Sequence, residues 1–251
     1  MFDVSKVVPQ AQPIVEAAAT VYLKHTSPWF VGLIAHGSAV KGGFIPGCSD
    51  IDLQLYLDGT TFTASQQLPI ELAIAIQRDL SKIDPAPFQY IQCYAFSSRL
   101  PENYVGPIPG AYAIISGSLP VPVTTPDQLQ QAAIQALTQL DPVPPFVTQG
   151  LLEHGGERFG LHIRWLCTNV WPNLYHMLVQ HQYDPIYIWN LPKEKAIALL
   201  PQDTMIGQTI RAFYEAVQTY YNHGKIVEDG LAVIENGIAF LQAAKLWWNE
   251  Q

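Results

Sequence analysis

The residues that decide the fold are 36–57, which read HGSAVKGGFIPGCSDIDLQLYL. A turn-forming pair, Gly37 and Ser38, opens this stretch, and a glycine-rich loop follows. The second half, IDLQLYL, alternates apolar and polar residues with the period of a strand. Alternate side chains of a strand point to the same face, so Asp50 and Asp52 project together while Ile51 and Leu53 face the core. The stretch therefore predicts a carboxylate pair on a rigid strand behind a glycine turn.

Carboxylates held in parallel repel one another unless a cation lies between them. Magnesium prefers such hard oxygen ligands and leaves positions open for phosphate oxygens. Gly37 permits close backbone approach, and the Ser38 hydroxyl with nearby N–H groups can hold a phosphate. Taken singly, a DxD pair is usually solvated and a Gly-Ser pair is usually a turn. Their order, spacing and strand context together favour metal-assisted phosphoryl chemistry.

Outward from this stretch, the sequence predicts a mixed α/β front half and an all-helical back half. Strands are expected at 30–35, 51–57, 88–96 and 111–116. Helices are expected at 13–25, 69–83, 126–140, 151–181, 193–200, 204–222 and 226–249. The proline-dense segment DPVPPF marks the expected domain boundary, since rigid extended segments commonly separate folding units. This predicts the α+β class, with one domain at 1–145 and a helical bundle at 146–251.

The composition narrows the function. The chain has 251 residues, 49% of them apolar and 14% charged, so a packed core is easy to build. A net charge of −8 argues against broad nucleic-acid binding and against anionic membranes. Three cysteines without a CxxC pair argue against a disulfide framework or a zinc site. We see no signal-peptide pattern and no membrane-spanning apolar run, and we expect a cytoplasmic protein.

The stretch 36–57 resembles the "GS…DxD" signature of the polymerase-beta superfamily of nucleotidyltransferases, and it looks most like the branch containing the aminoglycoside adenylyltransferases. This resemblance implies a nucleotidyltransferase domain with a small mixed sheet, followed by a helical bundle. It implies magnesium-dependent transfer of AMP from ATP onto a hydroxyl of a small-molecule acceptor, with release of pyrophosphate. Asp50 and Asp52 are then the metal ligands and catalytic carboxylates, and Gly37 and Ser38 bind the nucleotide phosphates.

A fainter resemblance lies in the helical half. Tyr175 and the segments 191–196 and 199–201 look like the helical domain of the streptomycin/spectinomycin-type adenylyltransferases. In those enzymes a lysine ahead of an alanine-rich helix reaches the nucleotide phosphates, and Lys193 is the matching position. Arg164 is the weaker candidate for the arginine that clamps the phosphates. The resemblance names neither the acceptor nor the oligomeric state.

The sequence also departs from the family. The strand that usually carries a third acidic residue reads FQYIQCYAF, and Gln89 or Gln92 occupies its place. An amide cannot take a proton near pH 7. The candidates to supply a base from elsewhere are Glu102, Glu153 and Glu157, with Glu153 preferred. Alternatively, positioning and electrostatics suffice without a strong base.

Other functions stay open as well. The chain is alternatively a weak or inactive nucleotide-binding module, or a transferase acting on a protein or RNA end. His36 is expected to be a neighbour of the phosphate site rather than a ligand.

Overall fold

The computed structural model describes residues 2–97, 99–100, 104–153, 156–181 and 184–251. The chain divides into two compact units, residues 1–124 and 125–251. The first unit contains α1 Gln12–Thr26, β1 Phe30–His36, α2 Ser38–Lys41, β2 Ile51–Leu57, α3 Ile70–Leu80, β3 Ile91–Phe96 and β4 Tyr112–Gly117. The second unit contains α4 Pro126–Thr138, α5 Pro145–Glu153, α6 Phe159–Gln180, α7 Pro185–Asn190, α8 Lys193–Ala198, α9 Met205–Asn222 and α10 Val227–Asn249.

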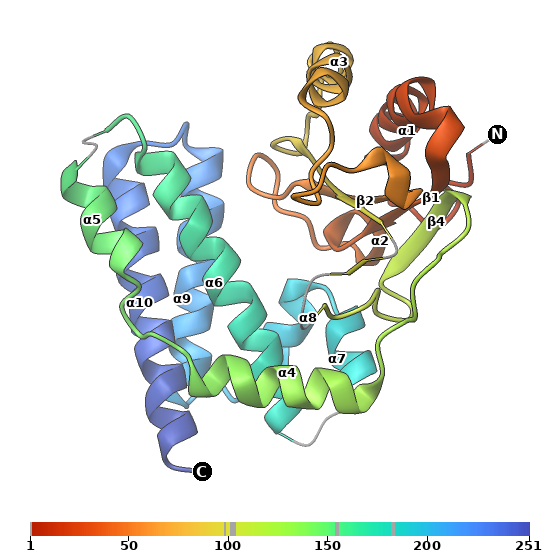
Figure 1. The fold of residues 1–251 in the computed structure, drawn as a ribbon. Helices are drawn as coiled ribbons and strands as arrows, with labels where there is room; N and C mark the ends of the chain where they lie inside the picture. The colour runs from red at the N-terminus through yellow and green to blue at the C-terminus, as the bar shows by residue number, and fades with distance from the viewer. Residues whose placement is uncertain (1, 98, 101–103, 154–155, 182–183) are drawn as a thin grey trace. The chain divides into compact units, whose positions relative to one another are not determined.

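The first unit is built on a sheet with the strand order β3-β2-β1-β4 (Figure 1). Strand β1 pairs antiparallel with both β2 and β4, whereas β2 and β3 run parallel. The sheet is therefore small and mixed, as the sequence predicts. The end of β1 and the starts of the other three strands meet at one edge, where His36, Asp52, Gln92 and Tyr112 form a single row.

The two faces of this sheet differ in chemistry because strand residues alternate. Ile51, Leu53 and Leu55 are buried and pack with side chains of α1 and α3, which cover this face (Figure 1). The alternate residues of β2, Asp52, Gln54 and Tyr56, lie on the opposite face. That face carries a smaller apolar cluster and leaves its polar edge uncovered by α1 and α3. The strand pattern thus places the acidic residues away from the main core.

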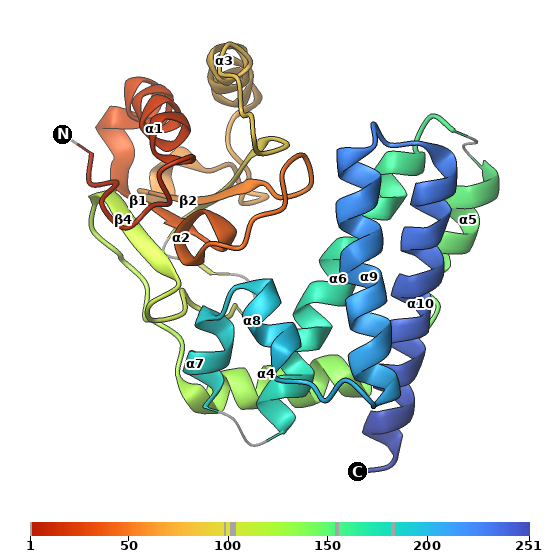
Figure 2. The same ribbon diagram turned by 180° about the vertical axis from the view of Figure 1, so that it is seen from behind.

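The second unit is all-helical in the described residues. Its long helices α6, α9 and α10 run side by side, and α4 packs across α6 (Figure 2). Helix α4 begins with a capping box, in which the side chains of Thr125 and Gln128 each bond to the backbone of the other residue. Thr204 caps α9 in a related way by accepting from the N–H of Gly207 at 3.1 Å. These caps fix where the chain enters each helix.

The α+β class with an all-helical second half is confirmed, but element bounds differ from the prediction. The expected helix 151–181 is observed as α5 and α6, and the short helices α2 and α7 were not expected. The compact units meet at 124/125, whereas the sequence places the boundary at 145/146. The structure groups α4 with the second unit because α4 packs on α6 and α10.

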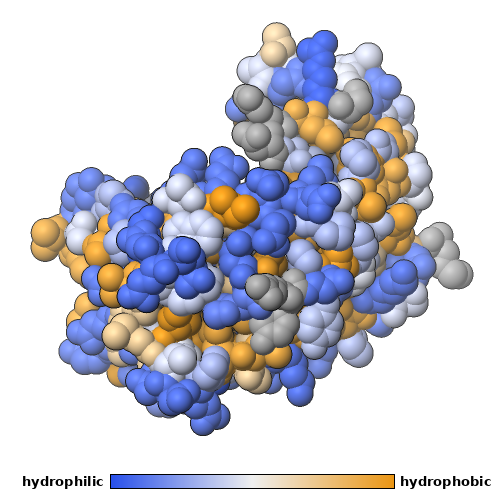
Figure 3. All heavy atoms as spheres, turned by 90° about the horizontal axis from the view of Figure 1, so that it is seen from below, coloured by the Kyte–Doolittle hydropathy of each residue, from blue (hydrophilic) through white to orange (hydrophobic). Residues whose placement is uncertain are grey.

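None of the helices in the described part of the chain is long and apolar enough to cross a bilayer. Hydrophilic residues spread over the face drawn in Figure 3, and apolar residues lie among them in small groups.

Candidate functional site

The turn after β1 brings backbone against a carboxylate. Gly37 has φ of +69° and ψ of −145°, a conformation that side-chain-bearing residues rarely adopt. A Cβ placed on Gly37 would lie 2.6 Å from Oδ2 of Asp52, so the position also lacks room for a side chain. Ser38 follows as the first residue of α2 and is buried. The glycine is therefore needed both for the turn and for the approach of Asp52.

Backbone hydrogen bonds on both sides hold Asp50 in place. The carbonyl of Ser49 accepts from the N–H of Gln89 at 2.8 Å, and the N–H of Ile51 donates to the carbonyl of Tyr90 at 3.0 Å. The buried Ser49 hydroxyl also accepts from the N–H of Ile45 at 2.9 Å, which closes the preceding loop. The chain around Asp50 is thus tied to the segment before β3, and Asp52 follows on β2 itself.

Strand β3 adds a third side chain to the pair. Gln92 stands opposite Asp52 in the parallel register. One end of its terminal amide lies 2.9 Å from Oδ2 of Asp50 and 3.1 Å from Oδ1 of Asp52, and the other end lies 2.9 Å from the hydroxyl of Tyr94. Carboxylate oxygens only accept, so we assign the amide nitrogen to the end that faces them. The two carboxylates therefore converge on one point, which Gln92 occupies.

His36 lies beside the carboxylate pair, and its place next to a phosphate site stays a prediction. It stands opposite Asp52 across the antiparallel pair. Burial lowers the pKa of His36 to about 4, and the charge of Asp50 opposes this shift only in part. The ring is therefore neutral at pH 7, and its Nε2 lies 3.3 Å from the amide nitrogen of Gln54. A neutral His36 brings no positive charge to a phosphate.

A polar network that sequence reasoning missed extends this row along β2. The amide oxygen of Gln54 accepts from the hydroxyl of Tyr56 at 2.6 Å and from the hydroxyl of Tyr104 at 3.0 Å. Its amide nitrogen faces His36, so the network holds the imidazole beside the carboxylate pair. The strand pattern could have predicted part of this network, because Gln54 and Tyr56 lie on the same face of β2 as Asp50 and Asp52.

The donor set fits one divalent ion of the magnesium type. Asp50 and Asp52 offer hard oxygens that converge on one point, and Mg²⁺ is commonly held by one or two carboxylates plus substrate phosphates and water. Among the described residues, no group of three or more His, Cys, Asp or Glu side chains could hold a metal.

The remaining predicted site residues belong to the second unit. Lys193 is the first residue of α8, and its ammonium group lies 5.7 Å from the ring centroid of Trp171. Arg164 is buried on α6, Glu153 is exposed at the end of α5, and Glu157 is exposed just before α6. The structure brings Gly37, Ser38, Asp50 and Asp52 together in the first unit. Glu102 lies outside the described residues.

The two parts of the fainter motif contact each other. The hydroxyl of Tyr175 on α6 donates to the carbonyl of Leu191 at 2.7 Å, and this bond fixes the turn that precedes Lys193. Tyr214 on α9 donates to Glu194 at 2.7 Å. The start of α8 is therefore held by both neighbouring helices.

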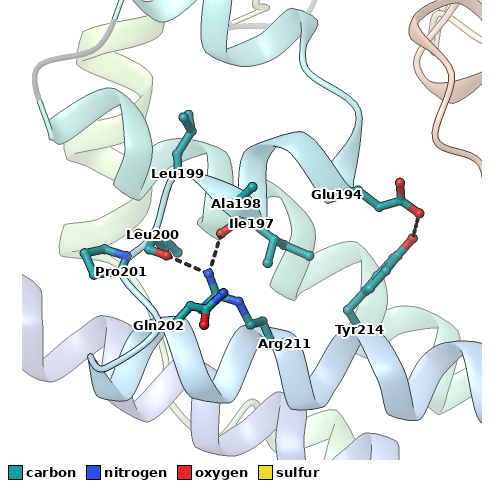
Figure 4. A pocket seen from close by; sticks show the side chains of 9 residues that line it. All are labelled: Glu194, Ile197, Ala198, Leu199, Leu200, Pro201, Gln202, Arg211 and Tyr214. Atoms are coloured by element: carbon teal, nitrogen blue, oxygen red, sulfur yellow. Dashed lines mark hydrogen bonds between the residues drawn. The ribbon is translucent and has the colours of Figure 1, made fainter.

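An open pocket of about 480 Å³ lies beside α8 (Figure 4). Arg211 lines it and donates to the carbonyls of Gly207, Ile197 and Leu200 at 2.6, 3.3 and 2.6 Å. The carbonyls of Ile197 and Leu200 lie at the end of α8 and just after it, and that of Gly207 lies in α9, so the guanidinium ties α8 to α9 within the fold.

The fold and the site define an α+β chain whose mixed sheet bears a carboxylate pair beside a glycine turn. No protein-family model matches the sequence, and no curated protein matches it. Among solved structures, the chain is similar to spectinomycin adenyltransferase AAD(9) from Enterococcus faecialis, whose crystal structure contains ATP and spectinomycin. The identity is 14%, the match covers 91% of this chain and 98% of that chain, and the TM-score is 0.46.

Proposed function

We propose that this protein is a magnesium-dependent nucleotidyltransferase that moves AMP from ATP onto a hydroxyl of a small-molecule acceptor. The observation that carries the proposal is the convergence of Asp50 and Asp52 on one point, directly against the turn at Gly37. The resemblance of residues 36–57 to the nucleotidyltransferase signature supports the same assignment. The net charge of −8 favours a cationic acceptor, such as an aminoglycoside.

In the proposed reaction the acceptor oxygen bonds to the α-phosphorus of ATP. The bond from that phosphorus to the oxygen bridging to the β-phosphate breaks, and pyrophosphate leaves. Gly37 and Ser38 hold phosphate oxygens, and Lys193 and Arg164 offset phosphate charge from the second unit. Asp50 and Asp52 would hold a magnesium ion, which would supply electrostatic stabilisation of the charge that develops on the phosphate oxygens. Glu153 is our candidate to take the hydroxyl proton.

One observation favours a second candidate function. Gln92 places a neutral amide where a third carboxylate is expected, and an amide neither takes a proton at pH 7 nor adds negative charge. A protein that binds ATP and metal without turnover would fit this substitution. Pyrophosphate release in the presence of an acceptor is the property that separates the two functions.

The test is ATP titration by calorimetry with and without Mg²⁺, followed by a pyrophosphate-release assay over a panel of aminoglycosides and other hydroxyl acceptors. The transferase predicts Mg²⁺-dependent binding and acceptor-dependent release. We expect Asp52→Asn to weaken metal-dependent ATP binding by about 100-fold or more. The far-UV circular dichroism spectrum, which reports the secondary structure, should stay unchanged. Asp203→Asn makes the same charge change at an exposed residue and should have no effect. Unchanged ATP affinity in Asp52→Asn would refute the assigned site.

A further inference from the structure

The distances from the Gln92 amide to the two carboxylates are compatible with two kinds of interaction, a hydrogen bond and shared coordination of a metal ion. Its near end is 2.9 Å from an oxygen of Asp50 and 3.1 Å from an oxygen of Asp52. Such distances suit hydrogen bonds from an amide nitrogen. They also suit neighbouring ligands of one octahedral Mg²⁺, because ligands about 2.1 Å from the ion at right angles lie about 3 Å apart. The same position therefore serves a donor when no ion is bound and a ligand when one is.

Tyr94 permits both orientations of this amide. Its hydroxyl lies 2.9 Å from the far end of the Gln92 side chain, and a phenol both donates and accepts. With nitrogen toward the carboxylates, Tyr94 donates to the amide oxygen. With oxygen toward the carboxylates, the amide nitrogen donates to Tyr94 instead. Either orientation satisfies the far end, so the occupant between Asp50 and Asp52 decides which one is stable.

We propose that Gln92 is a neutral third ligand of a single divalent ion held by Asp50 and Asp52. This inference rests on the proposed function. Its amide turns nitrogen toward the carboxylates in the ion-free site and turns oxygen toward them when the ion binds. The charges support a single ion, because two carboxylates and a neutral amide balance one divalent cation. A second ion at the same place would lack a protein countercharge.

Mn²⁺ binding to the full chain tests the proposal without any turnover. We expect the unmodified protein to bind one Mn²⁺, measured by the loss of the free-ion electron paramagnetic resonance signal. Gln92→Met keeps the length of the side chain but removes the amide, and should weaken Mn²⁺ binding about 10-fold. Gln92→Glu adds a charge and should tighten binding by a similar factor. Gln77→Met makes the same change at an exposed position of α3, away from the carboxylate pair, and should bind as the unmodified protein does.

Mg²⁺ titration by NMR provides a second measurement that does not depend on affinity. The side-chain NH₂ signals of Gln92, assigned by their loss in Gln92→Met, should shift as Mg²⁺ is added. Signals that do not move would overturn the proposal. Mn²⁺ binding by Gln92→Met that equals or exceeds that of the unmodified protein would also overturn it, because the amide would then be a spectator or a blocking group. Two ions bound to the unmodified protein would overturn it as well.

The proposed function fails in a different way. If the unmodified protein binds no Mn²⁺ even with a non-hydrolysable ATP analogue present, the carboxylate pair is not a metal site, and both proposals fall. If one ion binds and Gln92 proves indifferent, the metal-dependent function stands and only the role of Gln92 is lost.

Discussion

Asp52 lies against Gly37 so closely that no side chain fits between the turn and the carboxylate. A Cβ on Gly37 would stand 2.6 Å from Oδ2 of Asp52, and the φ of Gly37 is +69°. The position combines two separate demands, one on backbone conformation and one on space. A substitution at Gly37 therefore acts on the carboxylate pair as well as on the turn.

We predict that Gly37→Ala destabilises the first unit by about 1–3 kcal/mol. We also predict that it weakens Mn²⁺ binding about 10-fold or more, because Asp52 must move. Gly42→Ala is the control, since Gly42 has φ of +78° but no atom within 4 Å of a new Cβ. It should share the backbone strain and retain Mn²⁺ binding. Urea denaturation and calorimetry measure the two effects, and equal metal binding by both variants would contradict the prediction.

A partly buried histidine makes the second unit sensitive to acid. Burial lowers the pKa of His176 to about 4, whereas an unfolded chain binds this proton near pH 6.5. Between these values the unfolded state holds more protons, so stability rises with pH and is lost as pH falls from 6.5 toward 4. The loss amounts to about 2–3 kcal/mol. We predict that His176→Asn flattens this dependence.

Tryptophan fluorescence during urea denaturation at pH 4 to 7 would measure this pH dependence. The signal reports mainly on the second unit, because five of the six tryptophans lie after residue 124. His223→Asn replaces a histidine whose side chain is 64% exposed and serves as the control. A pH slope in His176→Asn as steep as that of the unmodified protein would contradict the assignment.

Lys193 offers a test of the second unit's part in nucleotide binding. We predict that Lys193→Met weakens ATP binding about 10-fold, because the role proposed for its ammonium group is to offset phosphate charge. Lys195→Met removes an exposed lysine two residues further along α8 and should leave ATP affinity unchanged. Calorimetric titration of both variants with ATP and Mg²⁺ would decide the matter. If Lys193→Met and Lys195→Met bind ATP with equal affinity, Lys193 does not contact the nucleotide.

The strands of the sheet and its acidic face could be predicted from the sequence, because the alternation of side chains along a strand is a local property. The alternation in residues 51–57 predicts that Ile51 and Leu53 face the core, and the structure buries both. Which of Gln89 and Gln92 stands beside the carboxylate pair could not be predicted from the local sequence. It depends on the register of β2 against β3, where Asp52 pairs with Gln92. A distant pairing of this kind leaves no trace in a single strand pattern.

The helical half was predicted less accurately. A continuous apolar periodicity across 151–181 does not show where one helix ends and another starts, and the structure has α5 and α6 there. The missed helix α7 has a clear local signal, since Asp184 caps it by accepting from the N–H of Tyr187 and Pro185 is its first residue. How Lys193, Arg164 and Glu153 relate to the carboxylate pair stays a prediction.

The parallel pairing of β2 and β3 makes the length of the connection between α3 and β3 a chemical variable. Cys93 follows Gln92 along the strand, and Ile91 precedes it. Deleting one residue from this connection, if the strand absorbed the change, would set a thiol opposite Asp52, and adding one would set a hydrocarbon there. Related chains should therefore differ in the composition of residues 81–90 but conserve their number.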